Sequence, residues 1–307
     1  MRNTEIKTFL LAYSAINNTG IKEWLKFIGA SDSSYLNLTH VQKTSAEVIT
    51  EAAGRRCYMS FEVGLNPNVT KIRENIVDYI DNILKVNHGS ILEHTYFTFA
   101  IENVSRVFTG EMNRHRAGMA ISEGSMRYIR FEDIPFWMPD SIRLTSKEQK
   151  IWSTNRSKIE AIGLGSDDFS FLSDEYTVAA DVHLIIKKLH SQELFRKAFS
   201  QMEKNYKEFC ARWEEELSPE STFKLKKQLT SCGRRIIGMG VSTGGVWTGN
   251  IRALRHIFEM RCSAEAEEEI FLVGSMLLQN MIETEPNLFG DFVQNENGHW
   301  KPKYRKV

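Results

Sequence analysis

The sequence predicts an α+β protein, a helix-rich single domain with a short sheet. Apolar residues recur at helical spacing over 41–60 and 69–86, and helical patterns return after residue 182. Between these segments, aromatic and β-branched residues over 96–99 predict a strand. A chain of 307 residues, 42% of them hydrophobic, can bury a substantial core. We therefore expect one domain over 1–307, with its core at about 41–290.

The first half of the chain supplies short elements. The run TFLLAYSAI (8–16) lacks a convincing cleavage site, so we interpret it as a core strand or the start of a helix. The helical pattern over 41–60 breaks at Gly54, which predicts a helix ending near a turn. Residues 69–86 form a helical apolar stripe with charges on the opposite face. The strand over 96–99 follows a glycine-containing turn.

The second half is expected to hold one insertion and two long helices. Proline, serines, glycines and paired aspartates make 136–176 a candidate surface insertion. The stretch GMGVSTGG (238–245) predicts a flexible turn that could line a site, followed by a long helix from about Asn250 to Glu283. The polar tail over 295–307 is expected to be loosely attached. A helix is also expected over 182–217, with a core side made of Leu184, Leu189, Phe195, Phe199, Met202, Phe209 and Trp213.

Composition excludes several classes of protein. Thirty-nine basic and thirty-nine acidic residues cancel, which argues against bulk attraction to nucleic acid or to an anionic membrane. The run IFLVGSMLL (270–278) is far shorter than the roughly 20 residues that a bilayer requires. The cysteines form no C-x-x-C pair, which favours free thiols in a reducing cytoplasm over a zinc site. They are Cys57, Cys210, Cys232 and Cys262.

The segment RHRAGMAISEGSMRY (114–128) has the pattern of a binding strip. Its arginines, Arg114, Arg116 and Arg127, offer planar donors that suit phosphate or the carbonyl oxygens of a pyrimidine or flavin ring. In an extended conformation Glu123, Ser125 and Arg127 would point to one side. A structural salt-bridge network at a subunit interface is the alternative interpretation.

Two further segments carry polar groups at suggestive spacing. In HGSILEH (88–94), the histidine and glutamate spacing matches no common zinc motif, so we expect no metal. In NIRALRHIFEMR (250–261), helical geometry places Arg252 and His256 on one rim, with apolar residues nearly opposite.

These three segments together resemble the flavin-dependent thymidylate synthase family. RHRAGMAISEGSMRY is similar to the family pattern R-H-R-x-x-S-x-N-E-x-S-x-R-Y, and HGSILEHTYFTF is similar to H-x-T/S-x-x-E-H-x-x-F-T-F. NIRALRHIFEMRCSAEAEEEI resembles the family's C-terminal motif. The motifs follow one another in the family's order over residues 50–280, which is far more specific than any one of them alone.

The chain departs from the family pattern in two places. Eight residues, AGMAISEG (117–124), separate the second arginine from the serine, where the family has seven, and Ser122 stands at the usual asparagine. Glu111 replaces a glutamine that commonly faces the nucleotide. Both departures fall in the pyrimidine and flavin region, and they put the identity of the nucleotide in doubt more than the type of reaction.

The resemblance implies a single catalytic domain with a thymidylate synthase-complementing-protein-like fold, in a cytoplasmic homotetramer whose active sites are shared between subunits. It implies FAD as cofactor, with NADPH and methylenetetrahydrofolate as co-substrates and dUMP as the small-molecule nucleotide substrate. The implied catalytic residues are Ser125, His256 and Arg261. The implied flavin-binding residues are His88, Ser90, Glu93, Arg114, His115, Arg116, Asn250, Arg252 and His256. The implied nucleotide-binding residues are Glu111, Glu123, Ser125, Arg127, Arg235 and Arg261, with Arg234 as an alternative to Arg235.

Two other functions stay open from the sequence. Glu111 and the extra residue in 117–124 are compatible with a flavin-dependent C5-methylase or hydroxymethylase of another pyrimidine nucleotide, such as UMP. A flavin- or nucleotide-binding protein without turnover is the alternative from a different class, and the retained arginines and His256 argue against it.

Overall fold

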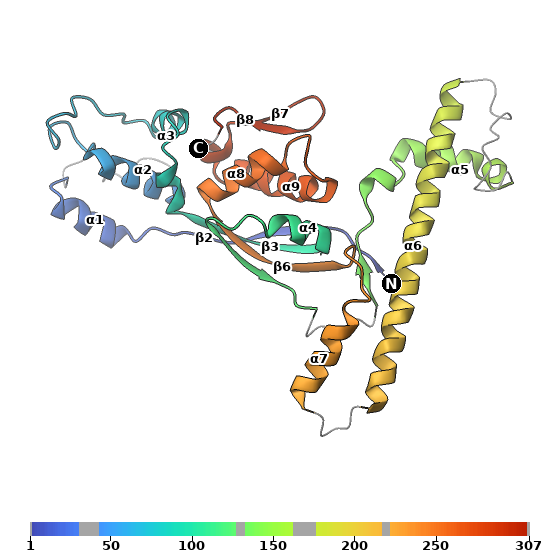
Figure 1. Cartoon of the computed structure of the whole chain (residues 1–307). Coiled ribbons are helices and arrows are strands. Elements are labelled where there is room, and N and C mark those ends of the chain that lie inside the picture. The colour runs from blue at the N-terminus through green and yellow to red at the C-terminus, as the bar shows by residue number, and fades with distance from the viewer. Residues whose placement is uncertain (1, 31–42, 127–132, 162–175, 217–221, 306–307) are drawn as a thin grey trace. The chain divides into compact units, whose positions relative to one another are not determined.

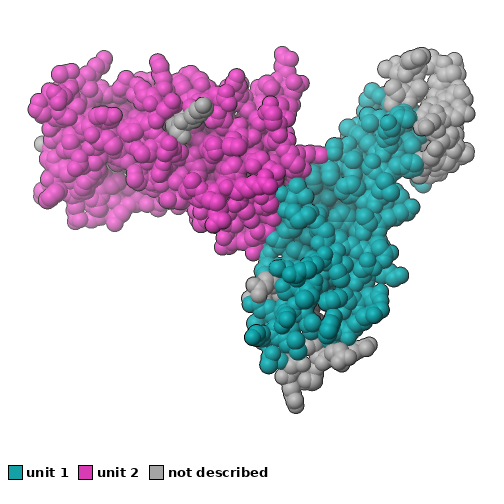
Figure 2. Space-filling model, viewed as in Figure 1, with its two compact units in different colours: residues 1–6, 103–107, 124–243 teal, residues 7–102, 108–123, 244–307 magenta. Residues whose placement is uncertain are grey.

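The computed structural model describes residues 2–30, 43–126, 133–161, 176–216 and 222–305. Helices dominate and the strands form small sheets, so the predicted helix-rich α+β class is confirmed (Figure 1). Contacts divide the chain into two compact units, coloured separately in Figure 2. Unit 1 contains residues 1–6, 103–107 and 124–243, and unit 2 contains 7–102, 108–123 and 244–307. The expectation of one catalytic domain over 1–307 stays a prediction.

A four-stranded sheet is the centre of unit 2. Its strand order is β2 (Lys7–Tyr13), β3 (Tyr96–Ser105), β6 (Ser242–Asn250) and β4 (Met119–Glu123). Alternate side chains of β3, those of Phe97, Phe99 and Ile101, are buried on one face, as strand geometry requires. The run over 8–16, expected as a core strand or a helix start, contains strand β2, but none of the β2 side chains is buried, so the prediction of a core strand is wrong. The strand expected at 96–99 is confirmed and longer.

Helices α8 (Ile251–Arg261) and α9 (Glu268–Thr284) pack on each other, and α9 also packs on β2. The prediction of one long helix from Asn250 to Glu283 is therefore wrong, because residues 262–267 interrupt it. The Glu267 carboxylate accepts the backbone N–H groups of Glu269 and Ile270 and so starts a new helix. Trp247 of β6 is buried edge-on against Phe108 of α4 (Arg106–Met112), with ring centroids 5.9 Å apart.

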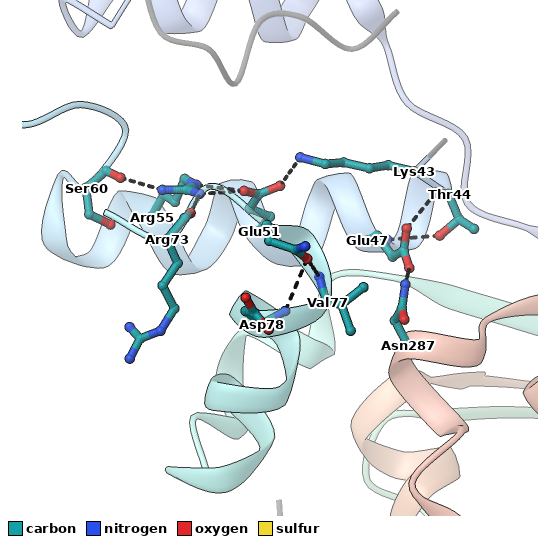
Figure 3. Close-up of polar contacts among 11 residues, drawn as sticks. Lys43, Thr44, Glu47, Glu51, Arg55, Ser60, Arg73, Val77, Asp78 and Asn287 are labelled. Atoms are coloured by element: carbon teal, nitrogen blue, oxygen red, sulfur yellow. Dashed lines mark hydrogen bonds and ion pairs between the residues drawn. The ribbon is translucent and has the colours of Figure 1, made fainter. Parts of the chain in front are cut away.

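A buried polar network anchors α2 (Ser45–Tyr58) to the rest of unit 2 (Figure 3). Thr44 and Glu47 form a capping box at its start, and Glu47 also accepts a hydrogen bond of 2.6 Å from Asn287 in α10 (Pro286–Phe289). Glu51 pairs with both Lys43 and Arg55 at 2.7 Å. These buried charges are paired, which is the condition for burying them at low cost.

Two helix boundaries differ from those expected. Gly54 lies inside α2 and does not end it; a Cβ at Gly54 would lie 2.3 Å from the hydroxyl oxygen of Tyr79, so this glycine permits close packing. Helix α3 (Ile76–Lys85) begins within the stripe predicted over 69–86, because the Asn75 side chain caps it through a bond of 2.8 Å from the Val77 N–H.

The glycine-rich stretch and the tail are also more ordered than expected. Residues 242–245 begin strand β6, so the prediction of a flexible turn over 238–245 is wrong for them. In the tail, β8 (Trp300–Pro302) pairs with β7 (Phe292–Gln294), and the Tyr304 hydroxyl donates to Asp81 at 2.6 Å. The prediction of a loose tail is therefore wrong for residues 295–305.

Unit 1 contains α5 (Ser146–Ala161), α6 (Tyr176–Glu216) and α7 (Phe223–Gly233), with β1 (Arg2–Asn3) parallel to β5 (Pro135–Phe136). Phe199 of α6 stacks on Phe136, with centroids 4.7 Å apart. The helix predicted over 182–217 is confirmed, but three side chains assigned to its core side, those of Leu184, Phe195 and Trp213, are exposed. Part of the predicted insertion, 162–175, lies outside the described residues.

The remaining helical segments are α1 (Asn18–Phe27), η2 (Gly89–Glu93) and η3 (Asp140–Ile142). The four cysteines are free thiols, and two of them, Cys57 and Cys232, are exposed. Within the part of the chain that the structure describes, no helix has the length and apolar character needed to cross a membrane.

Candidate active site

A pocket in unit 2 has a cavity volume of about 600 Å³, within the range for small-molecule and cofactor sites. The side chains around it come from all three sequence motifs that suggested a binding site. They are Glu93 and Tyr96 from HGSILEHTYFTF (88–99), Ala117 and Gly118 after the R-H-R triplet, and Asn250, Arg252, Ala253 and His256 from α8 and its cap.

The N-terminus of α8 opens at this pocket. Asn250 is the N-cap, and its Oδ1 accepts the Ala253 N–H at 2.8 Å. The N–H groups of Ile251 and Ala253 are already bonded, to the Thr95 carbonyl and to Asn250, so it is chiefly the helix dipole that makes this end favourable for a negatively charged ligand. Because the amide oxygen is committed to the cap, the Nδ2 group is the end of Asn250 that remains to donate.

A glycine turn lies against this cap. Gly118 has φ +70°, and its carbonyl accepts the Asn250 N–H at 3.0 Å. A Cβ at position 118 would lie 2.5 Å from Nδ2 of Asn250, closer than any real contact. Position 118 therefore needs glycine for its backbone conformation and also for the space that the Asn250 amide occupies.

Arg252 and His256 share the pocket side of α8, as the helical spacing predicted, while Ile251, Leu254 and Phe258 are buried. Arg252 Nη1 pairs with the Glu93 carboxylate at 2.5 Å, and both side chains remain nearly half exposed. An exposed pair of this kind contributes little to stability, so its charges are available to a ligand.

Arg261, at the end of α8, contacts two residues from the R-H-R region. Its Nη1 donates to Glu111 at 2.5 Å, and its Nε donates to Nε2 of His115 at 3.0 Å. Burial, together with the positive charge of Arg261 and the neighbouring His256, lowers the pKa of His115 to about 4. His115 is thus neutral near pH 7, and its ring lies 6.1 Å from that of His256.

Other expected flavin-binding residues lie on the same unit but do not line the pocket. His88 precedes η2 and its ring contacts that of Tyr58, with centroids 6.0 Å apart. Ser90, Arg114 and Arg116 are exposed. Arg114 approaches Glu111 only at 4.0 Å.

The expected nucleotide-binding residues are divided between the units. In unit 2, Glu123 accepts a hydrogen bond of 2.8 Å from Asn113. Ser125 and both candidate arginines, Arg234 and Arg235, belong to unit 1. Arg127 lies outside the described residues.

Arg106 is a residue that the sequence did not bring to attention. Burial and the positive charge of Arg234 lower its pKa, and its Nη2 donates to the Gly124 carbonyl at 2.6 Å. Two neighbouring guanidinium groups favour an anion between or beside them. Arg106 belongs to none of the three sequence motifs. Its position as a single arginine directly after an apolar strand is the one sequence feature that could have indicated it. Four pocket residues, Tyr96, Ala117, Gly118 and Ala253, were likewise missed.

No metal site accompanies these groups in the ranges described. The described residues contain no cluster of three or more histidine, cysteine, aspartate or glutamate side chains that could hold an ion.

The fold and the pocket define an α+β protein with a pocket between the loop that follows the R-H-R triplet and the N-terminus of α8. The chain belongs to the thymidylate synthase complementing protein family, whose model matches residues 39–287.

Two relatives of similar sequence are named as flavin-dependent thymidylate synthases. A probable flavin-dependent thymidylate synthase of Mycobacterium phage D29 is 30% identical over 81% of this chain and 84% of the phage protein. A flavin-dependent thymidylate synthase of Mycolicibacterium vanbaalenii is 29% identical over 80% of this chain and 78% of that protein. The fold is shared with a UMP/dUMP methylase, PolB from Streptomyces cacaoi, at a TM-score of 0.55 and 14% identity, covering 94% of this chain and 95% of that chain.

Proposed function

We propose that this chain is a flavin-dependent thymidylate synthase, which transfers a one-carbon unit from methylenetetrahydrofolate to C5 of dUMP and yields dTMP. The observation that carries the proposal is the pocket at the N-terminus of α8, where residues from all three family motifs meet. Family membership and the names of the relatives support the same activity.

The pocket fits a flavin nucleotide in charge and in size. Arg252 and the capped N-terminus of α8 offer positive charge and N–H donors to a pyrophosphate, and Asn250 offers its Nδ2 group. Tyr96 and His256 provide planar surfaces at the rim. When bound, reduced FAD supplies the hydride that converts the transferred methylene unit to a methyl group, and NADPH would keep the flavin reduced.

The chain's own residues would bind and orient the nucleotide. We assign the phosphate and the base edge to Ser125, Arg127 and Arg234, and we add Arg106. Arg234 is preferred to Arg235 because Arg235 is exposed and donates to the Ser231 carbonyl of the preceding helix α7 at 2.9 Å, whereas Arg234 lies within electrostatic range of Arg106.

Arg261 would donate to a carbonyl oxygen of the pyrimidine. Negative charge develops on that oxygen when C5 becomes nucleophilic, so a fixed guanidinium stabilises the transition state more than the ground state. Glu111, bonded to Arg261, and Glu123 would face the same ligand. Catalysis here needs orientation and electrostatic stabilisation, and it needs no hydrolytic triad.

A second candidate is methylation or hydroxymethylation of UMP. It is favoured by Glu111 at the position of the family's glutamine and by the extra residue in 117–124. PolB, a protein of similar fold, is named a UMP/dUMP methylase, which gives this candidate a precedent in another protein.

The test is product analysis by mass spectrometry with dUMP and UMP side by side, in the presence of FAD, NADPH and methylenetetrahydrofolate. The proposal expects dUMP to become heavier by one CH2 unit, with UMP unchanged. Conversion of UMP alone would favour the second candidate, and flavin binding with no product from either nucleotide would indicate a binding protein without turnover. We also propose a cytoplasmic homotetramer, which sedimentation analysis would test.

A further inference from the structure

The guanidinium of Arg261 is held at two separate nitrogens. Glu111, in α4, accepts from Nη1 at 2.5 Å, and His115, three residues beyond the end of α4, accepts from Nε at 3.0 Å. The Arg261 side chain is 16% exposed and that of Glu111 is 25% exposed, so the pair is only partly screened by water. Hydrogen bonds from two of its nitrogens restrict the rotation of this planar group.

The contact with Arg261 determines the state of His115. Because an arginine N–H always donates, Nε2 of His115 must carry a lone pair, which leaves the proton on Nδ1. A protonated His115 would have no lone pair to accept the Arg261 N–H, and its positive charge would repel Arg261. The surroundings of this ring support the neutral form: burial, followed by Arg261 and His256, lowers the pKa of His115 and Glu111 raises it, which leaves a pKa of about 4.

Arg261 keeps one part of its guanidinium uncommitted. Nη1 and Nε are bonded as described, and no partner for Nη2 is found among the residues that the structure describes. Arginine offers five N–H donors in a fixed fork, so holding two nitrogens aims the third. A lysine could not reproduce this arrangement, because its ammonium is a single rotating donor group.

We propose that Glu111 and His115 are positioning residues that jointly fix the guanidinium of Arg261, with neutral His115 as an acceptor, and direct Nη2 toward a carbonyl oxygen of the bound ligand. The inference rests on the proposed function for the identity of that ligand, a pyrimidine nucleotide. It assigns to His115 a role distinct from flavin binding, and it explains why a carboxylate at position 111 is compatible with an arginine that must face an uncharged base.

Kinetics of matched variants test the proposal. His115→Leu removes the acceptor at similar size, and we expect kcat to fall about 10- to 100-fold with KM for the nucleotide changed less than about threefold, as for loss of a hydrogen bond to a charged group. His115→Gln keeps an acceptor oxygen and should recover most of that loss. Equal defects in the two variants would overturn the proposal.

A double-mutant cycle separates positioning from independent action. If His115 acts through Arg261, the pair Arg261→Lys with His115→Leu should be no slower than Arg261→Lys alone, within about threefold. If the double variant loses activity by the product of the two single-variant losses, the proposal is overturned. A parallel loss of bound flavin and activity in His115→Leu would also overturn it, because it would show that the residue holds the cofactor. Asp81→Asn, which breaks an exposed pair with Lys303, is the control and should keep wild-type activity.

A spectroscopic measurement makes the test independent of turnover. In protein labelled with ¹⁵N-histidine, His115→Leu identifies one of the eight histidines, and its wild-type signals should report a neutral ring with the proton on Nδ1 at pH 7. A charged ring or a proton on Nε2 would overturn the inference. If the expected tautomer is observed but neither dUMP nor UMP yields product, the result would contradict the proposed function and still support the positioning of Arg261 by Glu111 and His115.

Discussion

Ser125 illustrates how a single residue in this chain differs from a hydrolase nucleophile. A serine needs an adjacent base to attack near neutral pH, and its sequence neighbours are Gly124 and Met126. Its expected task is to orient the nucleotide. Ser125→Ala should therefore lower kcat/KM by about one to three decades, roughly 1.4 to 4 kcal/mol, and leave measurable product in a steady-state assay. A trapped serine adduct in the wild type, with no turnover in the variant, would contradict this role.

The two neighbouring arginines of unit 1 give a residue-level comparison. Arg234→Ala should weaken nucleotide binding by about 1.5 to 3 kcal/mol, the scale of a charge-assisted hydrogen bond. Arg235→Ala should change the free energy of binding by only a few tenths of a kcal/mol, because Arg235 is exposed and already bonded to the Ser231 carbonyl of α7. Titration calorimetry with dUMP on the flavin-loaded protein measures both. A larger loss of nucleotide affinity in Arg235→Ala than in Arg234→Ala would assign the nucleotide contact to Arg235.

Sequence reasoning at this scale succeeded where local geometry decides and failed where tertiary contacts decide. Helical periodicity alone placed Arg252 and His256 on one face of α8, and both line the pocket. The pairing of Arg261 with Glu111 joins residues 150 positions apart, and no periodicity carries that information. Gly118 was missed because its requirement comes from Asn250 across the fold.

Among the elements, the turn before β4 lies within the segment that departs from the family pattern. β4 pairs with β6 without a bulge from Met119 to Glu123, so the extra residue in 117–124 does not distort the strand itself. Of the glycines flanking that strand, Gly118 has positive φ, which marks the turn at its start as the unusual one. The turn delivers Gly118 against the cap of α8 and thereby shapes the pocket.

Gly118→Ala should consequently damage the pocket. Positive φ alone costs about 1 kcal/mol for a non-glycine residue, and the collision with Nδ2 of Asn250 adds to this and displaces the cap. We expect FAD affinity, measured by fluorescence titration, to fall at least about tenfold. Gly64→Ala is the matched control, since Gly64 has φ +90° and nothing lies within 4 Å of the added Cβ. Equal flavin affinity in the two variants would show that the contact between position 118 and Asn250 does not shape the pocket.

Element boundaries were predictable only in part, for physical reasons. The apolar pattern of α8 and α9 is nearly continuous, and the break at 262–267 depends on the Glu267 cap, which a periodicity argument overlooks. Glycine usually ends a helix, but Gly54 continues α2 because Tyr79 packs against it. The strand β6 begins in a glycine-rich stretch, where strand propensity is low and pairing with its neighbours supplies the order.

For the whole molecule, the proposed function predicts that the purified protein carries flavin. Bound flavin would add partners for the α8 N-terminus, for the Asn250 amide and for Arg252, which is half exposed and paired with Glu93. A ligand that binds only the folded state stabilises it, so flavin binding should stabilise the fold. We expect an oxidised-flavin absorbance, and we expect the melting temperature to rise when FAD is added to stripped protein. Colourless protein that cannot be reconstituted with FAD would refute the assignment of the pocket.

The stability of the chain should also depend on pH through one buried carboxyl, Glu285, between α9 and α10. Burial and the nearby Glu47 raise its pKa to about 7, although the Thr44 hydroxyl donates to it at 2.5 Å. The folded state therefore holds this proton more tightly than the unfolded state does. The resulting stability is fully present below the ordinary value of 4.5 and is lost as pH rises through about 7.

Glu285→Gln should therefore stabilise the protein at pH 8 and have little effect at pH 5. A neutral amide keeps an oxygen that accepts from Thr44 and removes a negative charge buried beside Glu47. From the shift in pKa, the gain at pH 8 is about 1 to 3 kcal/mol in the free energy of unfolding, measured by urea denaturation. Glu283→Gln, an exposed carboxylate two residues away, is the control and should shift neither curve by more than a few tenths. Parallel wild-type and Glu285→Gln stability profiles between pH 5 and 8 would mean that Glu285 is ionised throughout and that its burial is offset by other groups.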